Sequence, residues 1–483
     1  MAQFDYDVLV IGSGAAGLTA AKTAVGLGKK VALIEKNDVL GGECTWGGCV
    51  PSKTLIKSAL VGYHIKNATK FGLTTDCDFG TENLMPYVRS VIKEVYKSHT
   101  PEKIAAYGIE VISGMAAKFV DAHTVQLEGH STSRTITAKK IIIATGSRPF
   151  IPKIQGLDTV QFLTNRNLFL LEELPKSIFI LGGGAIGTEM ASAMARLGVA
   201  VTILEMEKRI MAKDDPELVE MLVQAMRADG VVVRTGLRVI KVAQEHDGVV
   251  VTGIDNNEQE HTLRAEKLLV AVGRAPNVDS LNLTAAGIKV GPKGILADSQ
   301  LRTTAKNVYA CGDVVGPYKF SHMAWYQAVI AARNACIPFF KKHADYSQSI
   351  WVTFSAPELA AAGLTEPEAR AQYGDGIKVY SRSYGELDRG ITDRMVDGTL
   401  KVICDSKGYI IGAHMLGERA GDVIHELQVA KVKGIKLAAL HDVIHAYPTY
   451  AELVWHVSRK AYLEQLENTW YVKLAKKLLF RNK

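Results

Sequence analysis

Two cysteines near the N-terminus, Cys44 and Cys49, are separated by four residues, among them Gly47 and Gly48. Two thiols at this spacing can form a disulfide if the helix between them is distorted, and adjacent glycines permit that distortion. Two inert thiols and half of a metal site are the alternatives. The spacing is not that of a zinc knuckle, and no nearby histidine or cysteine completes one. We therefore predict no metal site and treat the pair as a candidate redox or catalytic centre.

The elements that must position this pair begin with a dinucleotide-binding pattern. A predicted strand at residues 6–11 leads into three spaced glycines, Gly12, Gly14 and Gly17. An alanine-rich helical segment and a second strand follow, and that strand ends at Glu35, 23 residues after Gly12. The glycines would let the backbone approach a pyrophosphate at the helix N-terminus, and the acid would bind a ribose hydroxyl. The pattern predicts a dinucleotide site.

The same arrangement returns 170 residues later. A strand at residues 177–181 precedes Gly182, Gly184 and Gly187, and Glu205 again follows the first glycine by 23 residues. Two copies predict two dinucleotide sites rather than packing glycines. A carboxylate at Glu205 accepts hydrogen bonds from the 2′-hydroxyl of NAD and repels the 2′-phosphate of NADP, so we expect NADH in preference to NADPH. Lys208 and Arg209 follow closely and could soften that preference.

Further motifs give the chain a resemblance to a known family. The cysteine pair continues into Pro51 and Lys53, and later segments read Ala-Thr-Gly at residues 144–146, Gly-Arg-Ala-Pro-Asn at residues 273–277 and Tyr-Ala-Cys-Gly-Asp at residues 309–313. With the two glycine patterns, these motifs are similar to those of the flavoprotein disulfide reductases. That family includes dihydrolipoyl dehydrogenase, glutathione reductase and mercuric reductase. The resemblance covers nearly the whole chain.

The resemblance implies FAD in the first site, a nicotinamide in the second, and a redox-active disulfide between Cys44 and Cys49. Cys49 would face the flavin in a charge-transfer complex, and Cys44 would exchange with substrate. Lys53 would lie under the flavin and pair with Glu189, with an ordinary interdomain ion pair as the alternative. Electrons would pass from NADH through flavin to the disulfide and then to an acceptor. The predicted cofactor-binding residues are Gly12, Gly14, Gly17, Glu35, Lys36, Gly42, Thr145, Gly146, Gly312, Asp313, Gly182, Gly184, Gly187, Glu205, Gly273 and Arg274.

The chain departs from the family near its C-terminus. In the dithiol-handling members the partner subunit supplies a His-Pro-Thr-x-x-Glu segment, whereas this chain has Tyr447 before Pro448 and Glu452. Tyrosine titrates near pH ~10 and histidine near ~6.5, so Tyr447 is predicted to be a poor base that could still donate a hydrogen bond or help hold a soft metal ion. His445 would share its face if the segment is extended and could stand in, with a structural role as the alternative.

The substitution argues against a dihydrolipoamide or glutathione substrate. A tyrosine at this point looks like mercuric reductases and soluble transhydrogenases. However, the chain lacks the C-terminal vicinal cysteines of the former, since its last cysteine is Cys404. It also has the complete cysteine pair that the latter lack. The sequence therefore falls between the subfamilies.

At about 150 residues per domain, the 483 residues predict about three domains. The expected fold class is α/β, with two Rossmann-like dinucleotide-binding domains and a C-terminal α+β dimerisation domain. The resemblance implies a homodimer that catalysis requires, in which Tyr447 and Glu452 would act on the cysteines of the neighbouring subunit. The predicted units are the FAD-binding domain at 1–150 and 276–345, the NAD(H)-binding domain at 151–275, the dimerisation domain at 346–460, and a basic amphipathic helix at 461–483.

The C-terminal segment has helical apolar spacing, at Leu463, Leu466, Trp470, Leu474 and Leu478. Five basic residues and no acid lie between Trp470 and the end of the chain, at Lys473, Lys476, Lys477, Arg481 and Lys483. Such a helix can lie on an anionic membrane surface or dock into a protein partner, with packing on the dimer as the alternative.

The remaining composition excludes other classes. The net charge of +7 is too mild to indicate nucleic acid, and no apolar run reaches the length of a membrane span. No signal peptide is recognised, and six cysteines are too few for a secreted disulfide framework, so we expect a cytoplasmic protein, or one peripheral to the membrane through its last helix.

We predict an FAD-dependent, NADH-oxidising reductase that passes electrons through Cys44 and Cys49 to a disulfide, persulfide or metal-ion acceptor. In a second interpretation electrons leave directly from flavin, as in a diaphorase or transhydrogenase. In a third, the chain is an electron-transfer subunit that docks a membrane or protein partner through its C-terminal helix.

Overall fold

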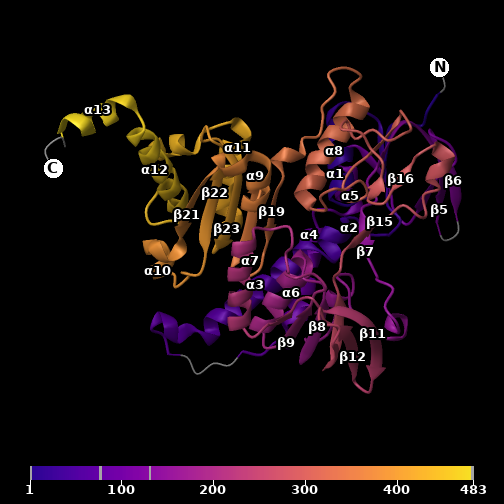
Figure 1. The fold of residues 1–483 in the computed structure, drawn as a ribbon. Coiled ribbons are helices and arrows are strands. Elements are labelled where there is room, and N and C mark those ends of the chain that lie inside the picture. Colours follow the sequence, from indigo (N-terminus) through magenta and orange to yellow (C-terminus); the bar gives the residue numbers. More distant parts are fainter. Residues whose placement is uncertain (1–2, 75–78, 130–131, 480–483) are drawn as a thin grey trace.

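The N-terminal unit is a seven-stranded sheet that carries the first glycine turn (Figure 1). The structure is a computed structural model that describes residues 3–74, 79–129 and 132–479. The strand order is β3-β2-β1-β6-β5-β4, and β18 also pairs with β6. Parallel pairing joins β3, β2, β1, β6 and β18, whereas β4, β5 and the first half of β6 are antiparallel. The strands are β1 (Tyr6–Ile11), β2 (Val31–Ile34), β3 (Ile109–Ile112), β4 (Ala116–Phe119), β5 (Thr124–Glu128), β6 (Ser133–Ile143) and β18 (Val308–Ala310).

Continuous apolar runs explain the parallel part of this sheet, because its strands are covered on both faces. In β1, Val8, Leu9 and Val10 are all fully buried. Alanines on α1 and α8 let these two helices pack side by side on one face of the sheet. The helices of this unit are α1 (Ala15–Gly26), α2 (Gly42–Trp46), α3 (Cys49–Lys66), α4 (Leu84–Tyr96), α5 (Pro101–Ala105) and α8 (Ser321–Cys336).

A second parallel sheet, in the order β10-β9-β8-β14, carries the second glycine turn. A three-stranded antiparallel sheet, β11-β12-β13, packs beside it, and the short pair β7–β15 connects this inserted unit to the first. The elements are β7 (Ser147–Pro149), β8 (Ser177–Leu181), α6 (Ala185–Arg196), β9 (Ala200–Leu204), α7 (Pro216–Ala228), β10 (Val232–Arg234), β11 (Arg238–Glu245), β12 (Gly248–Ile254), β13 (Glu260–Ala265), β14 (Lys267–Val270) and β15 (Arg274–Pro276).

The C-terminal unit is a five-stranded antiparallel sheet in the order β19-β20-β23-β22-β21. A small hairpin, β16 (Val290–Gly291) and β17 (Gly294–Ile295), precedes it in the chain. The elements of the C-terminal unit are β19 (Ile350–Thr353), β20 (Glu358–Gly363), α9 (Glu366–Tyr373), β21 (Lys378–Ser383), α10 (Asp388–Thr392), β22 (Thr399–Cys404), β23 (Ile410–Gly417), α11 (Ala420–Lys433), α12 (Glu452–Glu467) and α13 (Trp470–Leu479). Two Rossmann-like units and an α+β unit confirm the predicted fold class.

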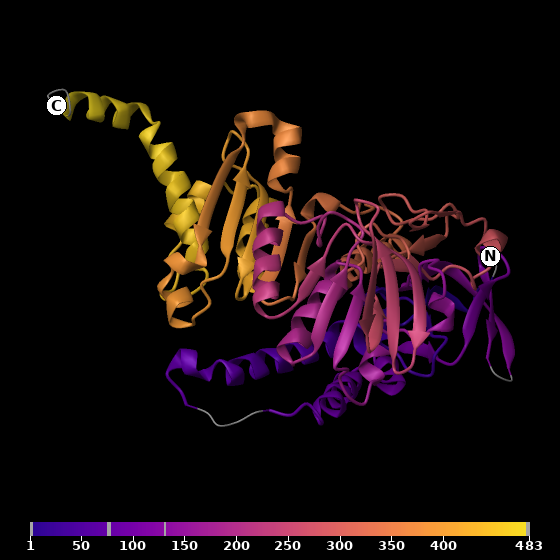
Figure 2. The ribbon, with the colours of Figure 1, turned by 60° about the horizontal axis from the view of Figure 1, so that its bottom comes forward.

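One hydrophobic cluster joins the three units beneath the cysteine pair. It contains Leu55 of α3, Met190 of α6 and Leu416 of β23, all buried. Figure 2 shows α3 passing below α6 and the C-terminal sheet, so the helix that begins at Cys49 reaches all three units. This packing fixes the cysteine pair relative to both glycine turns.

The C-terminal segment differs from the single helix predicted at residues 461–483. The helix is interrupted between α12, which ends at Glu467, and α13, which begins at Trp470. Asn468 donates its side-chain N–H to the carbonyl of Glu464 at 3.0 Å, and the Thr469 hydroxyl donates to that of Leu466 at 2.6 Å. Side chains that bond to preceding carbonyls compete with helix propagation, which explains the break. The predicted basic residues Arg481 and Lys483 lie outside the described residues.

Within the described part of the chain, we find no helix with the length and apolar character needed to cross a membrane.

Candidate active site

A cavity of about 2900 Å³ lies where the three units meet. Both glycine turns, both acids that follow them and both cysteines line it. The volume and the lining place two dinucleotide-binding surfaces in one continuous space with a pair of thiols.

The two glycine turns have the same internal contacts. Gly12 has a φ of +103°, and a Cβ there would lie 2.5 Å from the Ala144 carbonyl oxygen. Gly182 has a φ of +108°, and its Cβ would lie 2.7 Å from the Ala271 carbonyl oxygen. Each turn therefore requires glycine twice over, for its backbone conformation and for the close approach of the next strand. The repeat seen in sequence is a repeat of the same turn in space.

The helices that follow these turns begin with free N–H groups. Gly14 and Gly184 are the N-caps of α1 and α6, and neither helix has a side-chain cap or an acid in its first turn. Unpaired N–H groups at a helix N-terminus form an anion site, and the glycines leave room for a pyrophosphate. The residues present therefore fit FAD at α1 and a nicotinamide dinucleotide at α6.

The acid after each turn is held in place by hydrogen bonds. Glu35 Oε2 accepts from the backbone N–H and the hydroxyl of Ser13, at 3.0 and 2.7 Å. Glu205 Oε2 accepts from the backbone N–H of Gly183 at 2.6 Å. Both carboxylates thus close onto their own glycine turn, where a ribose would lie.

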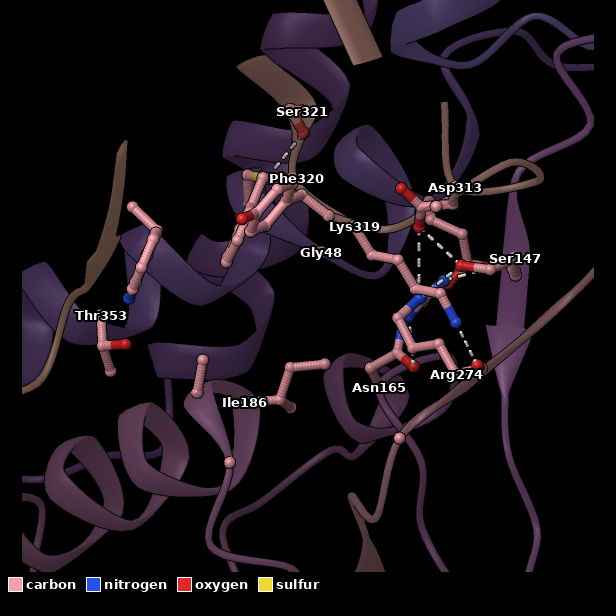
Figure 3. A pocket seen from close by; sticks show the side chains of 18 of the residues that line it. Gly48, Ser147, Asn165, Ile186, Arg274, Asp313, Lys319, Phe320, Ser321 and Thr353 are labelled. Carbon is pink, nitrogen blue, oxygen red and sulfur yellow. Dashed lines mark hydrogen bonds and ion pairs between the residues drawn. The ribbon is translucent and has the colours of Figure 1, made fainter. Parts of the chain in front are cut away.

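The cysteines lie at the junction of α2 and α3. Cys49 is the first residue of α3, and its Sγ lies 3.3 Å from the hydroxyl oxygen of Ser321, the first residue of α8 (Figure 3). Both thiols are free in this structure. Gly47 and Gly48 break the helix between them, as expected, but their backbone φ values are negative. Glycine is needed there for close packing, because a Cβ on Gly47 would lie 2.8 Å from the Asn165 carbonyl oxygen.

The pKa values of the two thiols are shifted in opposite directions. The hydrogen bond from Cys44, followed by the Ser321 hydroxyl and the charge of Lys53, lowers the pKa of Cys49 to about 6. The interaction with Cys49 and burial raise the pKa of Cys44 well above its ordinary value. The directions of the two shifts favour a thiolate on Cys49 and a protonated thiol on Cys44.

Lys53 and Glu189 join the three units beside this pair. Lys53 Nζ lies 2.7 Å from Glu189 Oε2 and 4.5 Å from the centre of the Phe354 ring. Glu189 Oε1 accepts from the backbone N–H of Phe354 at 2.9 Å. The ion pair predicted between Lys53 and Glu189 is thus present, and it also contacts the segment after β19 of the C-terminal unit.

A second polar cluster surrounds Arg274 (Figure 3). Its Nε donates to the Ser147 hydroxyl at 2.7 Å and lies 3.6 Å from Asp313, which in turn accepts from Ser147 at 2.6 Å. Its other nitrogens reach Asn165 and Glu43, at 3.4 and 3.3 Å. The cluster links β7, β15 and the loop after β18, where the predicted FAD-binding residue Asp313 lies.

Glu43 ties α2 to this cluster. Asn165 donates to both Glu43 Oε2 and the Gly47 carbonyl at 2.8 Å, and Arg166 donates to Glu43 Oε1 at 2.7 Å. Burial acts to raise the pKa of Glu43, but Arg274, Asn165 and Arg166 together lower it. Both ends of the short helix that carries Cys44 are therefore held.

Most predicted site residues line the cavity. Gly17 and Gly187 do not, because they pack beneath their turns, against the carbonyls of Gly12 and Gly182. The remaining predicted cofactor-binding residues all line it, together with Cys44, Cys49, Lys53 and Glu189.

Tyr447, His445 and Glu452 lie outside the cavity of their own chain. The Tyr447 hydroxyl donates to Asp388 of α10 at 2.6 Å, on the far side of the C-terminal sheet from α2 (Figure 1). That bond raises the pKa of Tyr447 above its ordinary value, so it stays protonated and acts as a donor. Glu452 Oε2 accepts from the backbone N–H of Thr449 at 3.0 Å.

His445 does not share the face of Tyr447. Its side chain is 7% exposed and its Nε2 lies 3.0 Å from Glu426 of α11, whereas Tyr447 is 68% exposed. The shared face would have required an extended segment, whereas the ring of His445 is turned into its own subunit, where its Nδ1 also contacts the Val443 carbonyl at 2.9 Å. These surroundings fit a structural role for His445, which was the alternative to its acting in place of the missing histidine.

Sequence reasoning missed Ser321, Glu43, Asn165 and Lys319, all of which line the cavity. Glu43 stands beside Cys44 in the printed sequence, and its charge in a glycine-rich segment was an available signal. Ser321, Asn165 and Lys319 belong to no motif, and only the packing of distant segments brings them to the site.

Comparison with known proteins agrees with this architecture. Residues 6–332 match the family model described as pyridine nucleotide-disulphide oxidoreductase, and residues 349–457 match its dimerisation domain, which supports a homodimer. A mercuric reductase from Bacillus cereus is 36% identical over 93% of this chain and 70% of its own length. A dihydrolipoyl dehydrogenase from Geobacillus stearothermophilus is 34% identical over 95% of this chain and 96% of its own length.

Among solved structures, a Cu(II) complex of the HOCl-induced flavoprotein disulfide reductase RclA from Escherichia coli superimposes with a TM-score of 0.85. It is 28% identical, and the match covers 95% of this chain and 100% of that chain. The resemblance proposed from the motifs is therefore confirmed. The chain belongs to the pyridine nucleotide-disulphide oxidoreductases, a family of FAD-dependent enzymes that use NAD(P)H.

Proposed function

We propose that this chain is an FAD-dependent, NADH-oxidising reductase that passes electron pairs through a Cys44–Cys49 disulfide to a soft metal ion. The observation that carries the proposal is the position of the thiols, which share one cavity with both glycine turns. Bound FAD would supply the two-electron relay between the nicotinamide and the thiols.

The chain's own residues account for the binding and the proton balance. The free N–H groups of α1 and α6 would hold the two pyrophosphates, and Glu35 and Glu205 the riboses. Reduction of the disulfide takes up two electrons and one proton. The opposite pKa shifts assign that proton to Cys44 and the negative charge to Cys49.

Tyr447 favours a metal ion over a disulfide as acceptor. A disulfide acceptor must receive protons as it is cleaved, which calls for an acid–base group of moderate pKa, and Tyr447 is held protonated by Asp388. A soft metal ion displaces the thiol proton on binding, so it needs no such relay. Relatives named mercuric reductase and the Cu(II) complex of RclA support the same class of acceptor. Reduction of Hg(II) to Hg(0) by NADH balances with release of NAD⁺ and one proton.

NADH is the proposed donor because Glu205 closes onto the second glycine turn. Arg209, which could have bound a 2′-phosphate, instead donates to the carbonyls of Ala212 and Asp214, at 2.6 and 3.2 Å. Lys208 is exposed and is not among the residues that line the cavity.

The test is anaerobic NADH oxidation with a panel of acceptors: Hg(II), Cu(II), oxidised lipoamide and glutathione disulfide. We expect the metal ions to be reduced faster than either disulfide. Cys44→Ser should abolish metal reduction while NADH still bleaches the flavin. Cys336→Ser, a cysteine outside the cavity, is the matched control and should retain full activity.

Unchanged metal reduction in Cys44→Ser would contradict the proposal and favour direct transfer from flavin. Faster reduction of a disulfide than of either metal ion would overturn the choice of acceptor but not the role of the thiols.

A further inference from the structure

The last described helix, α13, projects from the body of the molecule. In both views it extends beyond α12, on the side of the molecule away from the N-terminal sheet (Figures 1 and 2). Its side chains are mostly exposed, with Trp470 at 76% and Leu478 at 64%. The function proposed above makes no use of this helix.

The residues of α13 separate into two faces. Successive residues of an α-helix are about 100° apart, which places Trp470, Leu474, Leu478 and Tyr471 on one continuous apolar arc. Lys473, Lys476 and Lys477 fall together on a separate arc. No acidic residue occurs in the helix, and the nearest partner is Glu467 at the end of α12, 3.2 Å from Lys476.

This pattern fits a membrane surface better than a protein groove. An interfacial helix places aromatic and aliphatic side chains at the boundary of the acyl chains, with lysines level with the headgroups. Trp470 and Tyr471 at the first turn are the side chains that favour that boundary. The three clustered lysines, with no acidic residue in the helix, are complementary in charge to an anionic surface. A protein partner would instead have to supply several carboxylates to pair with them.

We propose that α13 is an interfacial helix that binds this enzyme to anionic membrane surfaces. Trp470, Tyr471, Leu474 and Leu478 enter the headgroup boundary, and Lys473, Lys476 and Lys477 contact anionic headgroups. A homodimer presents two copies of the helix, and binding of both copies to one surface would strengthen attachment through effective concentration. The attachment is independent of the redox cycle, because no cavity-lining residue lies on α13.

The test is sedimentation of the purified holoenzyme with vesicles of phosphatidylcholine alone or with added phosphatidylglycerol. We expect binding to the anionic vesicles that weakens as salt rises, and little binding to the neutral ones. The triple variant Lys473→Glu, Lys476→Glu and Lys477→Glu should bind at least about 100-fold more weakly, since each basic residue near an anionic surface contributes about fivefold. Leu474→Ser with Leu478→Ser should weaken binding at constant charge.

The matched control reverses three exposed lysines elsewhere, Lys93, Lys97 and Lys103, which have no ion pair among the described residues. It changes the net charge equally and should keep most of the vesicle binding. Quenching of Trp470 fluorescence by brominated lipid, absent in Trp470→Phe, would place the helix in the bilayer boundary.

Equal loss of binding in the control would overturn the proposal, because general charge would then explain the attachment. Dissociation of the homodimer by the α13 substitutions would also overturn it, since the apolar face would then belong to a contact between copies of this chain. NADH oxidation in solution should be unchanged in every α13 variant, so a failure here is distinguishable from a failure of the proposed function.

Discussion

Ser321→Ala tests the acidity of the proposed flavin-side thiol. The hydroxyl oxygen of Ser321 lies 3.3 Å from Cys49 Sγ and is one of the groups that lower the pKa of that thiol to about 6. Alanine removes the hydroxyl but keeps the first residue of α8 and its backbone. We expect the pKa of Cys49 to rise, because the thiolate loses a hydrogen-bond donor.

The size of the change follows from the contact. A hydrogen bond to a charged group contributes about 1.5–3 kcal/mol, and one pKa unit corresponds to about 1.4 kcal/mol. Because Cys49 faces the open cavity, we expect the lower end, about one unit. At pH 7 the thiolate fraction of Cys49 would fall from about nine-tenths, for a pKa of about 6, to about one-half.

The assay is the pH dependence of Cys49 alkylation by iodoacetamide in the reduced protein, with the modified residue identified by mass spectrometry. The midpoint should move upward by about one unit in Ser321→Ala, and the charge-transfer absorbance of the flavin should follow the same curve. Ser321→Thr keeps the hydroxyl and should restore the midpoint of the parent protein.

An unchanged midpoint in Ser321→Ala would refute the role of this hydroxyl. A midpoint that moves equally in Ser321→Thr would also refute it, because the effect would then come from repacking at the start of α8.

Three further outcomes are expected. Glu205→Ala should narrow the preference for NADH over NADPH, measured as the ratio of kcat/KM values, because the carboxylate that repels a 2′-phosphate is gone; equal values for the two nucleotides in the parent protein would contradict this. Tyr447→His should raise the rate of reduction of oxidised lipoamide by about tenfold or more at pH 7, because histidine partly restores general acid–base assistance. The gain should fade above pH ~8, where the thiol ionises unaided. Rapid lipoamide reduction by the parent protein would show the reasoning to be wrong. Gly12→Ala should yield colourless protein without FAD, since its Cβ would lie 2.5 Å from a carbonyl oxygen, whereas the parent protein should be yellow with one FAD per chain.

Local patterns were sufficient to predict the dinucleotide sites. The strands at residues 6–11 and 177–181 have the predicted bounds, and each leads into a glycine with positive φ. Such a turn is determined by residues within a few positions of one another, because only glycine tolerates both the conformation and the close approach. The pairing of Lys53 with Glu189 was available only through the family resemblance, since 136 residues separate the two.

The C-terminal segments show where local patterns fail. Alternation would place His445 and Tyr447 on one face if their segment were an extended strand, but His445 contacts Glu426 and Tyr447 contacts Asp388, so the two side chains lie on different sides. Helical spacing predicted one helix at residues 461–483, but the side chains of Asn468 and Thr469 bond back to the carbonyls of α12 and end it. In both cases a side-chain contact outweighed the periodicity.

The sequence by itself determined the two glycine turns, their acids and the spacing of the cysteines, because these features depend on backbone conformation over short distances. Only the tertiary structure decided how acidic those cysteines are. Ser321 reaches Cys49 from a helix 272 residues later in the chain, and Glu43 is held by Arg274 and Asn165 from two other segments. The charge on a thiol depends on the donors, cations and burial around it, and these come from segments that meet only when the three units pack together.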